Sequence, residues 1–214
     1  MHVRTPAGIR PVRLVAFAAA LLVPLLALAA PAAHAGPLVA SAPDCDAQQL
    51  ETPFTRWGDV ASYTLAPNGV AENRADWSLQ DGADVKPGNE SFYVHDEDEK
   101  SSLALPPGSS ATTASMCVGL TRPTLRFFAR NDGSPFSVLR VDVLFEDNLG
   151  AVWSVPIGTM LGAAEWQPTL PLAVVANLLP LLPGGNTAVA FRFTPDKAGD
   201  WKIDDVYVDP WRHG

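Results

Sequence analysis

Histidine and cysteine, from which many enzymes build reactive and metal sites, are scarce in this sequence. It contains four histidines and two cysteines, and only His95 and His213 lie beyond the first 35 residues. No Gly-x-Ser-x-Gly motif and no histidine pair with metal-binding spacing occurs. These absences disfavour serine hydrolases and histidine-ligated metalloenzymes, so we expect that the protein is not an enzyme. A glycoside hydrolase with paired carboxylates stays open as an alternative, because that chemistry needs no histidine.

Basic residues and long apolar runs are also in short supply. Lysine and arginine together number 15 against 23 acidic residues, which gives a formal net charge of −8. An acidic chain repels phosphate backbones, so nucleic acid is disfavoured as a partner. After residue 30 no apolar run is long enough to cross a bilayer, and we expect no membrane span after processing.

The N-terminus has the pattern of a secretory signal. Three arginines precede the apolar run Leu14–Ala30, and the small residues Ala33 and Ala35 follow it. This order is typical of a cleaved signal peptide, which predicts removal of residues 1–35 and a secreted, extracellular protein beginning at Gly36. A permanent membrane anchor is the alternative, but the run is at the lower length limit for a span and is interrupted by proline.

The two cysteines, Cys45 and Cys117, both lie after the predicted cleavage site. In an oxidising compartment an isolated pair is most simply a disulfide. A metal site would need more ligands, and a nucleophilic thiol would need a nearby base. We therefore predict a Cys45–Cys117 bridge.

Short runs of alternating apolar and polar residues fill the rest of the chain. The clearest is Ser137–Glu146, which is followed by the turn Asp147–Gly150 and a hairpin partner, Ala151–Ile157. Further alternating segments are predicted as strands at Thr124–Arg130, Thr187–Thr194 and Trp201–Val208. Prolines and glycines separate these segments, and the pattern predicts an all-β protein with one antiparallel β-sandwich.

The predicted domain organisation has one folded unit. Residues 36–44 are expected to be a flexible leader, residues 45–210 the β-sandwich domain, and residues 211–214 a C-terminal tail. The apolar segment Leu170–Leu182 is interrupted by prolines, so it is either a buried connection or a strand with a short helix.

Two segments resemble known jelly-roll domains. The ending Trp201–Pro210, with its Ile-Asp-Asp-Val core, resembles the last strand of galactose-binding-like domains, which include many carbohydrate-binding modules. The segment Leu65–Glu72, followed by Trp77, is similar to the opening pattern of those modules. Trp57-Gly58-Asp59, Gly88-Asn89-Glu90 and Cys117 also resemble a group of uncharacterised bacterial secreted proteins. The resemblance implies a jelly roll that binds carbohydrate.

The same resemblance implies a structural Ca²⁺ held by an acidic residue of the last strand and a glutamate near the domain start. The candidates in this chain are Glu72 with Asp204 or Asp205. Oxygen ligands suit a hard cation. Alternatively, the two aspartates bond backbone amides or pair with basic residues at the sheet end. The apolar alternation also breaks here, which predicts a bulge.

A set of mainly basic residues occupies outward positions of three predicted strands, namely Arg126, Phe128, Arg130, Arg140 and Arg192. If these strands share a sheet, the five side chains form a ligand-binding face for a glycan. The alternatives are a salt-bridge ladder with Asp142 and Glu146, or a face covered by Leu170–Leu182. The charge run His95–Lys100 is predicted to be a solvated loop or an edge strand, and a metal or catalytic site is the alternative.

These observations predict a secreted, non-catalytic binding domain, with a carbohydrate or a cell-envelope glycan as its partner. An extracellular structural or protein-interaction domain without a sugar site is the second hypothesis, and the glycoside hydrolase is the third. Composition and motifs give no oligomeric state.

Overall fold

Antiparallel strands form nearly all of the regular structure in the computed structural model, which describes residues 2, 35–175 and 180–210. The described residues 35–175 and 180–210 belong to one compact unit. The predicted signal peptide, apart from residues 2 and 35, and the predicted tail at 211–214 lie outside the described residues. No helix among the described residues is long and apolar enough to cross a membrane.

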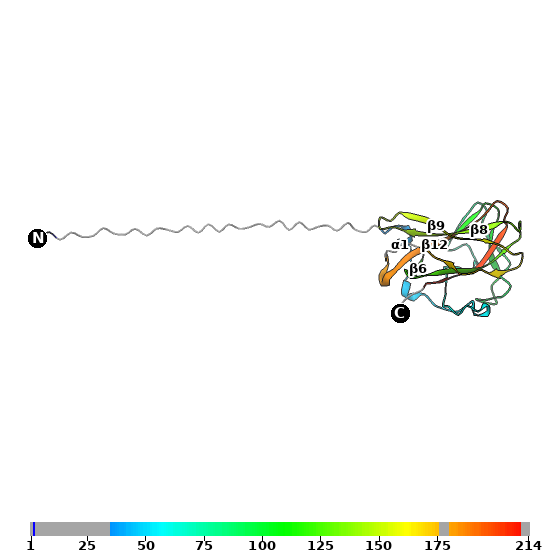
Figure 1. The fold of residues 1–214 in the computed structure, drawn as a ribbon, viewed down its shortest axis with the longest axis horizontal. Helices are drawn as coiled ribbons and strands as arrows, with labels where there is room; N and C mark the ends of the chain where they lie inside the picture. The colour runs from blue at the N-terminus through cyan, green and yellow to red at the C-terminus, as the bar shows by residue number, and fades with distance from the viewer. Residues whose placement is uncertain (1, 3–34, 176–179, 211–214) are drawn as a thin grey trace. The chain divides into compact units, whose positions relative to one another are not determined.

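The first sheet has seven strands. The last of them along the chain is coloured red in Figure 1. Its central path runs in the order β10 (Gln167–Pro168), β7 (Thr124–Asn131), β13 (Trp201–Asp209), β4 (Ser101–Leu105) and β3 (Asp84–Pro87). Two short strands join it from the side: β1 (Thr64–Leu65) pairs with β13, and β11 (Leu172–Ala173) pairs with β7.

The second sheet has six strands. Its path runs in the order β2 (Trp77–Gln80), β5 (Ser110–Thr113), β12 (Asn186–Pro195), β8 (Val138–Glu146) and β9 (Val152–Leu161), and β6 (Met116–Gly119) also pairs with β12. The described helices are short: α1 (Pro37–Ala40) and the 3₁₀ turns Cys45–Ala47, Thr55–Trp57 and Pro183–Gly185.

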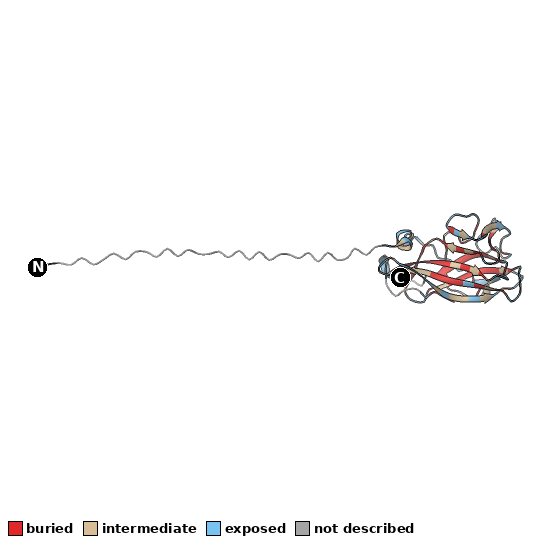
Figure 2. Cartoon of the chain, turned by 90° about the horizontal axis from the view of Figure 1, so that it is seen from above, coloured by how far each residue is buried: buried red, intermediate tan, exposed pale blue. Residues whose placement is uncertain are grey.

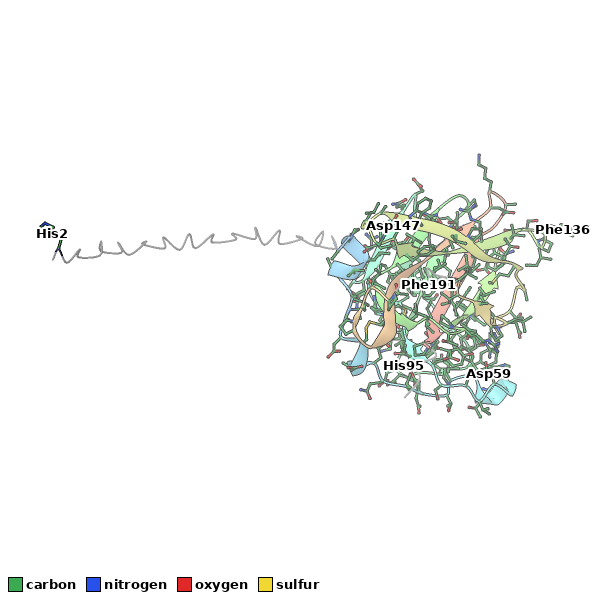
Figure 3. The ribbon with its side chains drawn as sticks, turned by 60° about the vertical axis from the view of Figure 1, so that its left-hand side comes forward. His2, Asp59, His95, Phe136, Asp147 and Phe191 are labelled. Atoms are coloured by element: carbon green, nitrogen blue, oxygen red, sulfur yellow. A yellow bond between two sulfur atoms is a disulfide. The ribbon has the colours of Figure 1, made fainter. Side chains whose placement is uncertain are left out.

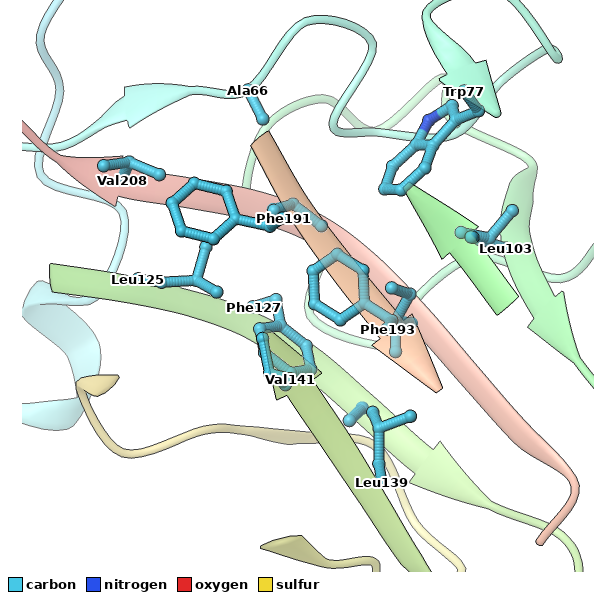
Figure 4. Packing of buried hydrophobic residues seen from close by; sticks show 14 of the residues in the cluster. Ala66, Trp77, Leu103, Leu125, Phe127, Leu139, Val141, Phe191, Phe193 and Val208 are labelled. Carbon is cyan, nitrogen blue, oxygen red and sulfur yellow. The ribbon is translucent and has the colours of Figure 1, made fainter. Parts of the chain in front are cut away.

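The main core lies between the two sheets. Alternating residues of β8 and β12, such as Val141 and Phe193, are fully buried, because one face of each strand meets the opposite sheet (Figure 4). The rings of Phe127 on β7 and Phe193 on β12 meet edge to face with centroids 5.0 Å apart. Figure 2 shows the buried residues concentrated along the strands. The predicted antiparallel β-sandwich is therefore confirmed.

The predicted strands are also confirmed, with small shifts at their ends. The observed β7, β8, β9, β12 and β13 coincide with the five alternating segments. The turn after β8 is closed by two backbone hydrogen bonds, from Gly150 to Asp147 and from Asp147 to Ala151. Of the ambiguous segment, Leu172–Ala173 forms β11, while residues 176–179 lie outside the described residues.

A second apolar cluster covers the outer face of the seven-stranded sheet. Its buried members are Phe54, Tyr63, Phe128, Trp166 and Tyr207. Phe128 and Tyr207 point outward from β7 and β13, and the loop before β1 supplies Phe54 and Tyr63. This sheet is thus covered on both faces.

The predicted disulfide is confirmed, since Cys45 and Cys117 are bonded with their Cα atoms 5.4 Å apart. It attaches the segment after α1 to β6. In the predicted leader, the backbone N–H groups of Leu38 and Val39 donate to the carboxylate of Glu146 on β8. The Ser115 hydroxyl donates to the Leu38 carbonyl, so this segment is hydrogen-bonded to the sandwich.

Candidate functional site

The five residues predicted to form one ligand face lie on two different sheets. Arg126, Phe128 and Arg130 belong to β7 of the seven-stranded sheet. Arg140 on β8 and Arg192 on β12 belong to the six-stranded sheet. The prediction of a single shared face was therefore wrong, because alternation along a strand says which face a residue takes but not which sheet.

Arg126 is a structural residue, only 5% exposed. Its Nη1 donates to Asp59 Oδ2 at 2.6 Å and its Nε to the Thr169 carbonyl at 2.9 Å. The guanidinium lies 4.0 Å from the centroid of the Phe54 ring. Burial would raise the pKa of Asp59, but hydrogen bonds, including that from Arg126, hold it below its usual value. Asp59 lies at the border of the molecule in Figure 3, far from Phe191.

Phe128 and Arg130 do not form an open aromatic and basic surface either. Phe128 is fully buried, and its ring stacks on Phe54 with centroids 5.7 Å apart. Arg130 pairs with Asp132, and its guanidinium lies 5.9 Å from the Trp166 ring centroid. The residues that cover Phe128 come from segments without strand alternation, so the burial of this ring could not be predicted from alternation.

Arg140 and Arg192 do come together, on either side of Asp142. Arg140 donates to Asp142 Oδ2 from Nε at 3.1 Å, and its Nη2 lies 3.0 Å from the same oxygen. Arg192 Nη2 lies 3.4 Å from that oxygen and donates to the Ser154 hydroxyl at 2.7 Å. The Asp142 side chain is 3% exposed and that of Arg140 is 51% exposed, so the carboxylate lies beneath the guanidinium groups.

Polar side chains surround this arginine pair on the face of the six-stranded sheet that points away from the core. The strand register aligns Ser78 with Thr112, Thr112 with Arg192, and Arg192 with Asp142. A second row aligns Thr194, Arg140 and Thr159. We name as the outer polar face the residues Ser78, Gln80, Ser110, Thr112, Arg140, Asp142, Ser154, Thr159, Arg192 and Thr194. All of them except Asp142 are at least partly exposed.

Buried carboxyl groups form a separate cluster at the bulge of β13. The register shifts after Asp204, as the broken alternation predicted, and Asp205 has a left-handed φ of 47°. Asp204 accepts hydrogen bonds from the backbone N–H groups of Glu90 and Asp205, at 2.9 and 3.0 Å. Neither carboxylate oxygen of Asp205 has a hydrogen-bond partner in the described structure.

Burial is the main cause of the raised pKa values of Asp204 and Asp205. Burial, with a smaller contribution from the Asp205 charge, raises the pKa of Asp204 to about 10. Burial and the charges of Glu99, Glu90 and Glu51 raise the pKa of Asp205 to about 8. In the absence of a cation, both side chains are therefore expected to be protonated at neutral pH.

Two glutamates that sequence reasoning missed belong to this cluster. The carboxylate of Glu90 is fully buried and accepts from the backbone N–H groups of Phe92 and Val94, at 2.5 and 2.7 Å. Glu99 is buried, and its Oε1 lies 2.6 Å from His95 Nδ1. The prediction of a wholly solvated run at His95–Lys100 was therefore wrong at Glu99. Burial raises the pKa of both glutamates.

The predicted calcium ligands are only partly suited to a cation. Asp205 offers two buried oxygens without partners and Glu99 offers one, which is the donor chemistry that Ca²⁺ prefers. Glu72 is exposed, and its Oε1 accepts from the backbone N–H groups of Lys100 and Ser101. Within the described residues, no group of three or more His, Cys, Asp and Glu side chains is placed to hold a metal ion. Glu72, Asp204 and Asp205 thus do not form such a group, and a site here would also need backbone carbonyl oxygens.

No protein-family model and no curated protein sequence matches the chain. Among solved structures, it is similar to the CBM22-1 and GH10 modules of Clostridium thermocellum endo-1,4-beta-D-xylanase 10B, complexed with xylohexaose. The identity is 15% and the TM-score 0.49, over 71% of this chain and 28% of that one. This chain thus spans less than a third of that protein.

Two isolated modules are also similar. One is the CBM22-1 xylan-binding domain from Paenibacillus barcinonensis Xyn10C, at 13% identity and a TM-score of 0.47, over 68% of this chain and 94% of that one. The other is TmCBM61 in complex with beta-1,4-galactotriose, at 18% identity and a TM-score of 0.39, over 68% and 96%. Which ligand the present chain binds is inferred below from its own side chains.

Proposed function

We propose that the protein is a secreted, non-catalytic domain that binds a carbohydrate or a cell-envelope glycan on the outer polar face. The observation behind this proposal is the alignment of hydroxyl, amide and guanidinium groups in rows across the six-stranded sheet. Sugars are polyols, and such groups exchange hydrogen bonds with them. Five strands about 4.8 Å apart give a face roughly 19 Å wide, which accommodates an extended glycan chain.

The composition of this face favours a sugar over a protein partner. Protein interfaces have an apolar, often aromatic centre with a polar rim. By register, the apolar residues Leu144, Val152, Pro156 and Ala190 lie on the same side of the sheet as the outer polar face, and none of them is aromatic. A mainly polar surface without an aromatic centre suits a hydroxyl-rich ligand better than a protein partner.

The carboxylates of the sheet's outer side support a non-catalytic role. A glycoside hydrolase needs two carboxyl groups free to flank the scissile bond. Asp142 is bound by Arg140 and Arg192, and Glu146 accepts from the N–H groups of Leu38 and Val39. Neither carboxylate is therefore positioned to act as acid, base or nucleophile on the glycosidic bond of a glycan bound across the face.

Secretion is part of the same proposal. The Cys45–Cys117 disulfide supports it, because such bonds persist in oxidising compartments. Intact-mass measurement on secreted material tests it, and we expect a chain beginning at Gly36 with no free thiol. Two free thiols per chain would contradict this part of the proposal.

Binding to an array of polysaccharides tests the proposed ligand class. We expect the double variant Thr112→Val with Gln80→Ala to lose most of its binding, because both side chains belong to the outer polar face. The matched control is Thr121→Val with Gln49→Ala, which changes the same residue types at exposed positions outside that face. If the wild-type protein bound none of the polysaccharides on the array, the proposed function would be overturned.

A protein-interaction role is the second candidate, and one observation favours it. A cavity of about 320 Å³ lies among β7, β9, β10 and β11, lined mainly by apolar groups that include Trp201. Leu161 and Leu170 beside it are 68% and 81% exposed. Exposed apolar groups of this kind can meet a partner protein. Changing both leucines to serine should leave glycan binding intact if the first proposal is right.

A further inference from the structure

We infer that the glycan bound by the outer polar face is anionic and bears carboxylate groups, as polyuronates do, with Arg140 and Arg192 as its carboxylate-binding residues. This inference rests on the proposed function and adds the charge of the ligand. It arises from how the two guanidinium groups are held and from the charge they leave unbalanced.

The arginine pair has one more positive charge than its surroundings neutralise. Both guanidinium groups contact a single carboxylate oxygen, Asp142 Oδ2. In a balanced cross-strand ladder each arginine would face its own acid. Asp142 is the one acidic residue of the outer polar face as defined above, and Glu146, which lies farther along β8 on the same side of the sheet, accepts from the N–H groups of Leu38 and Val39. Arg140, Arg192 and Asp142 together therefore have a net charge of one positive unit, which a ligand carboxylate would balance.

The same contacts orient the guanidinium groups before any ligand arrives. Asp142 is held in place by the sheet and fixes Arg140 through Nε and Nη2. Ser154 on β9, two strands away from β12, fixes Arg192 through Nη2. Each guanidinium has five N–H donors in a rigid plane, and several of these have no partner among the described residues. Two parallel N–H groups of a guanidinium that have no partner match the two oxygens of a carboxylate.

The negative net charge of the protein makes this inference more specific. The full sequence has a formal net charge of −8, and the secreted chain without residues 1–35, which hold three arginines and no acid, has −11. Such a charge repels a polyanion at long range, so general electrostatic attraction cannot supply the affinity. Binding of an acidic glycan must therefore depend on direct contact with Arg140 and Arg192. Neutralising either residue should abolish most of the binding, whereas neutralising a distant arginine should change little.

The test compares two polymers that differ in their carboxylates alone. Affinity electrophoresis of the secreted protein through gels containing polygalacturonate, or the same polymer with its carboxyl groups methyl-esterified, gives a dissociation constant for each. Alginate and its ester form a second pair, and galactan provides a neutral polymer. We expect at least tenfold tighter binding to the charged member of a pair than to its ester.

Variants assign that preference to the arginine pair. Arg140→Gln and Arg192→Gln should each weaken binding to the charged polymer about tenfold, and Arg140→Lys should also weaken it, because lysine keeps the charge but lacks the planar fork. Arg130→Gln on the other sheet is the matched control and should bind as wild type. Thermal unfolding of each variant checks that it is folded.

The outcomes separate the inference from the proposed function. Preference for a charged polymer that is lost in both glutamine variants supports the inference. Equal binding to the charged, esterified and neutral polymers, unchanged in the variants, overturns the inference and leaves the proposed function standing. Binding to none of the polymers, charged or neutral, contradicts both.

Discussion

The backbone N–H of Glu90 donates to Asp204 Oδ2 at 2.9 Å, which joins two residues 114 positions apart in the chain. Asp204 lies at the bulge of β13, and Glu90 begins the loop that carries Phe92 and Val94 over the outer face of the seven-stranded sheet. The Glu90 carboxylate in turn binds the N–H groups of those two residues. Asp204 therefore links the last strand to the aromatic cover of this sheet.

The first prediction concerns that link. Asp204→Ala removes the acceptors for the N–H groups of Glu90 and Asp205, at a cost of about 1–3 kcal/mol for each buried donor left without a partner. Chemical denaturation should therefore show a clear loss of stability. Asp98→Ala, at an exposed acidic position, is the control and should stay within about 0.5 kcal/mol of wild type. Equal stability of the two variants would show that Asp204 does not support the loop.

The second prediction is a loss of stability as pH rises. The folded-state pKa values of Asp204 and Asp205, about 10 and about 8, lie above the 3.8 of an unperturbed aspartate. The folded protein thus holds protons that the unfolded chain releases above about pH 4. Unfolding therefore becomes easier from about pH 4 up to about pH 8 for the contribution of Asp205 and up to about pH 10 for that of Asp204. In EDTA, the melting temperature should be higher at about pH 5 than at about pH 8.

The variant Asp205→Asn isolates the cause of this pH dependence. The side-chain amide has nearly the same shape and cannot ionise, and Asp205 has no side-chain hydrogen bond to lose in the described structure. The variant should therefore show a flatter dependence of melting temperature on pH. A wild-type melting temperature that rises between about pH 5 and about pH 8 in EDTA would contradict the prediction.

The third prediction addresses the proposed calcium. A cation at Asp205 would compete with the proton, so Ca²⁺ should raise the melting temperature more at about pH 8 than at about pH 5. Differential scanning calorimetry of metal-free protein, with and without Ca²⁺, measures this. The effect should disappear in Asp205→Asn and persist in Asp98→Ala. Identical curves with Ca²⁺ and with EDTA at both pH values would reject calcium.

The fourth prediction separates a structural arginine from a binding arginine. Arg126→Ala leaves Asp59 without its ion pair and opens space beside Phe54, so we expect a loss of about 2–4 kcal/mol. Arg140→Ala should cost less, about 1–2 kcal/mol, because the buried Asp142 carboxylate keeps Arg192 as a partner. Urea denaturation of both variants measures the difference. Similar losses for the two would mean that the Arg140 contacts are also structural.

Much of the sandwich could be predicted from alternation, because burial of one strand face repeats every second residue. The pattern in Ser137–Glu146 placed Val141 and Val143 in the core and Arg140 outside it, as observed. The broken period at Asp204 likewise predicted the bulge. The disulfide followed from the lone cysteine pair.

The candidate site was harder to predict for two physical reasons. Strand adjacency depends on long-range pairing, so alternation could not show that β7 lies in a different sheet from β8 and β12. A residue that points away from one core can also be buried in another, as Phe128 is beneath Phe54 and Trp57. The density of aromatic residues between Phe54 and Tyr63 was the available signal for that second cluster.

The central claim, that the outer polar face binds a glycan, is tested most directly by mapping backbone amide shifts in ¹⁵N–¹H spectra of the secreted protein. Titration with oligogalacturonate, and separately with neutral galacto-oligosaccharides, should perturb amides of β5, β8 and β12 around Thr112, Arg140 and Arg192. The chemical-shift changes of these amides should all fit a single dissociation constant. Shifts confined to the seven-stranded sheet and its covering loops, or no shifts with either ligand, would contradict the claim.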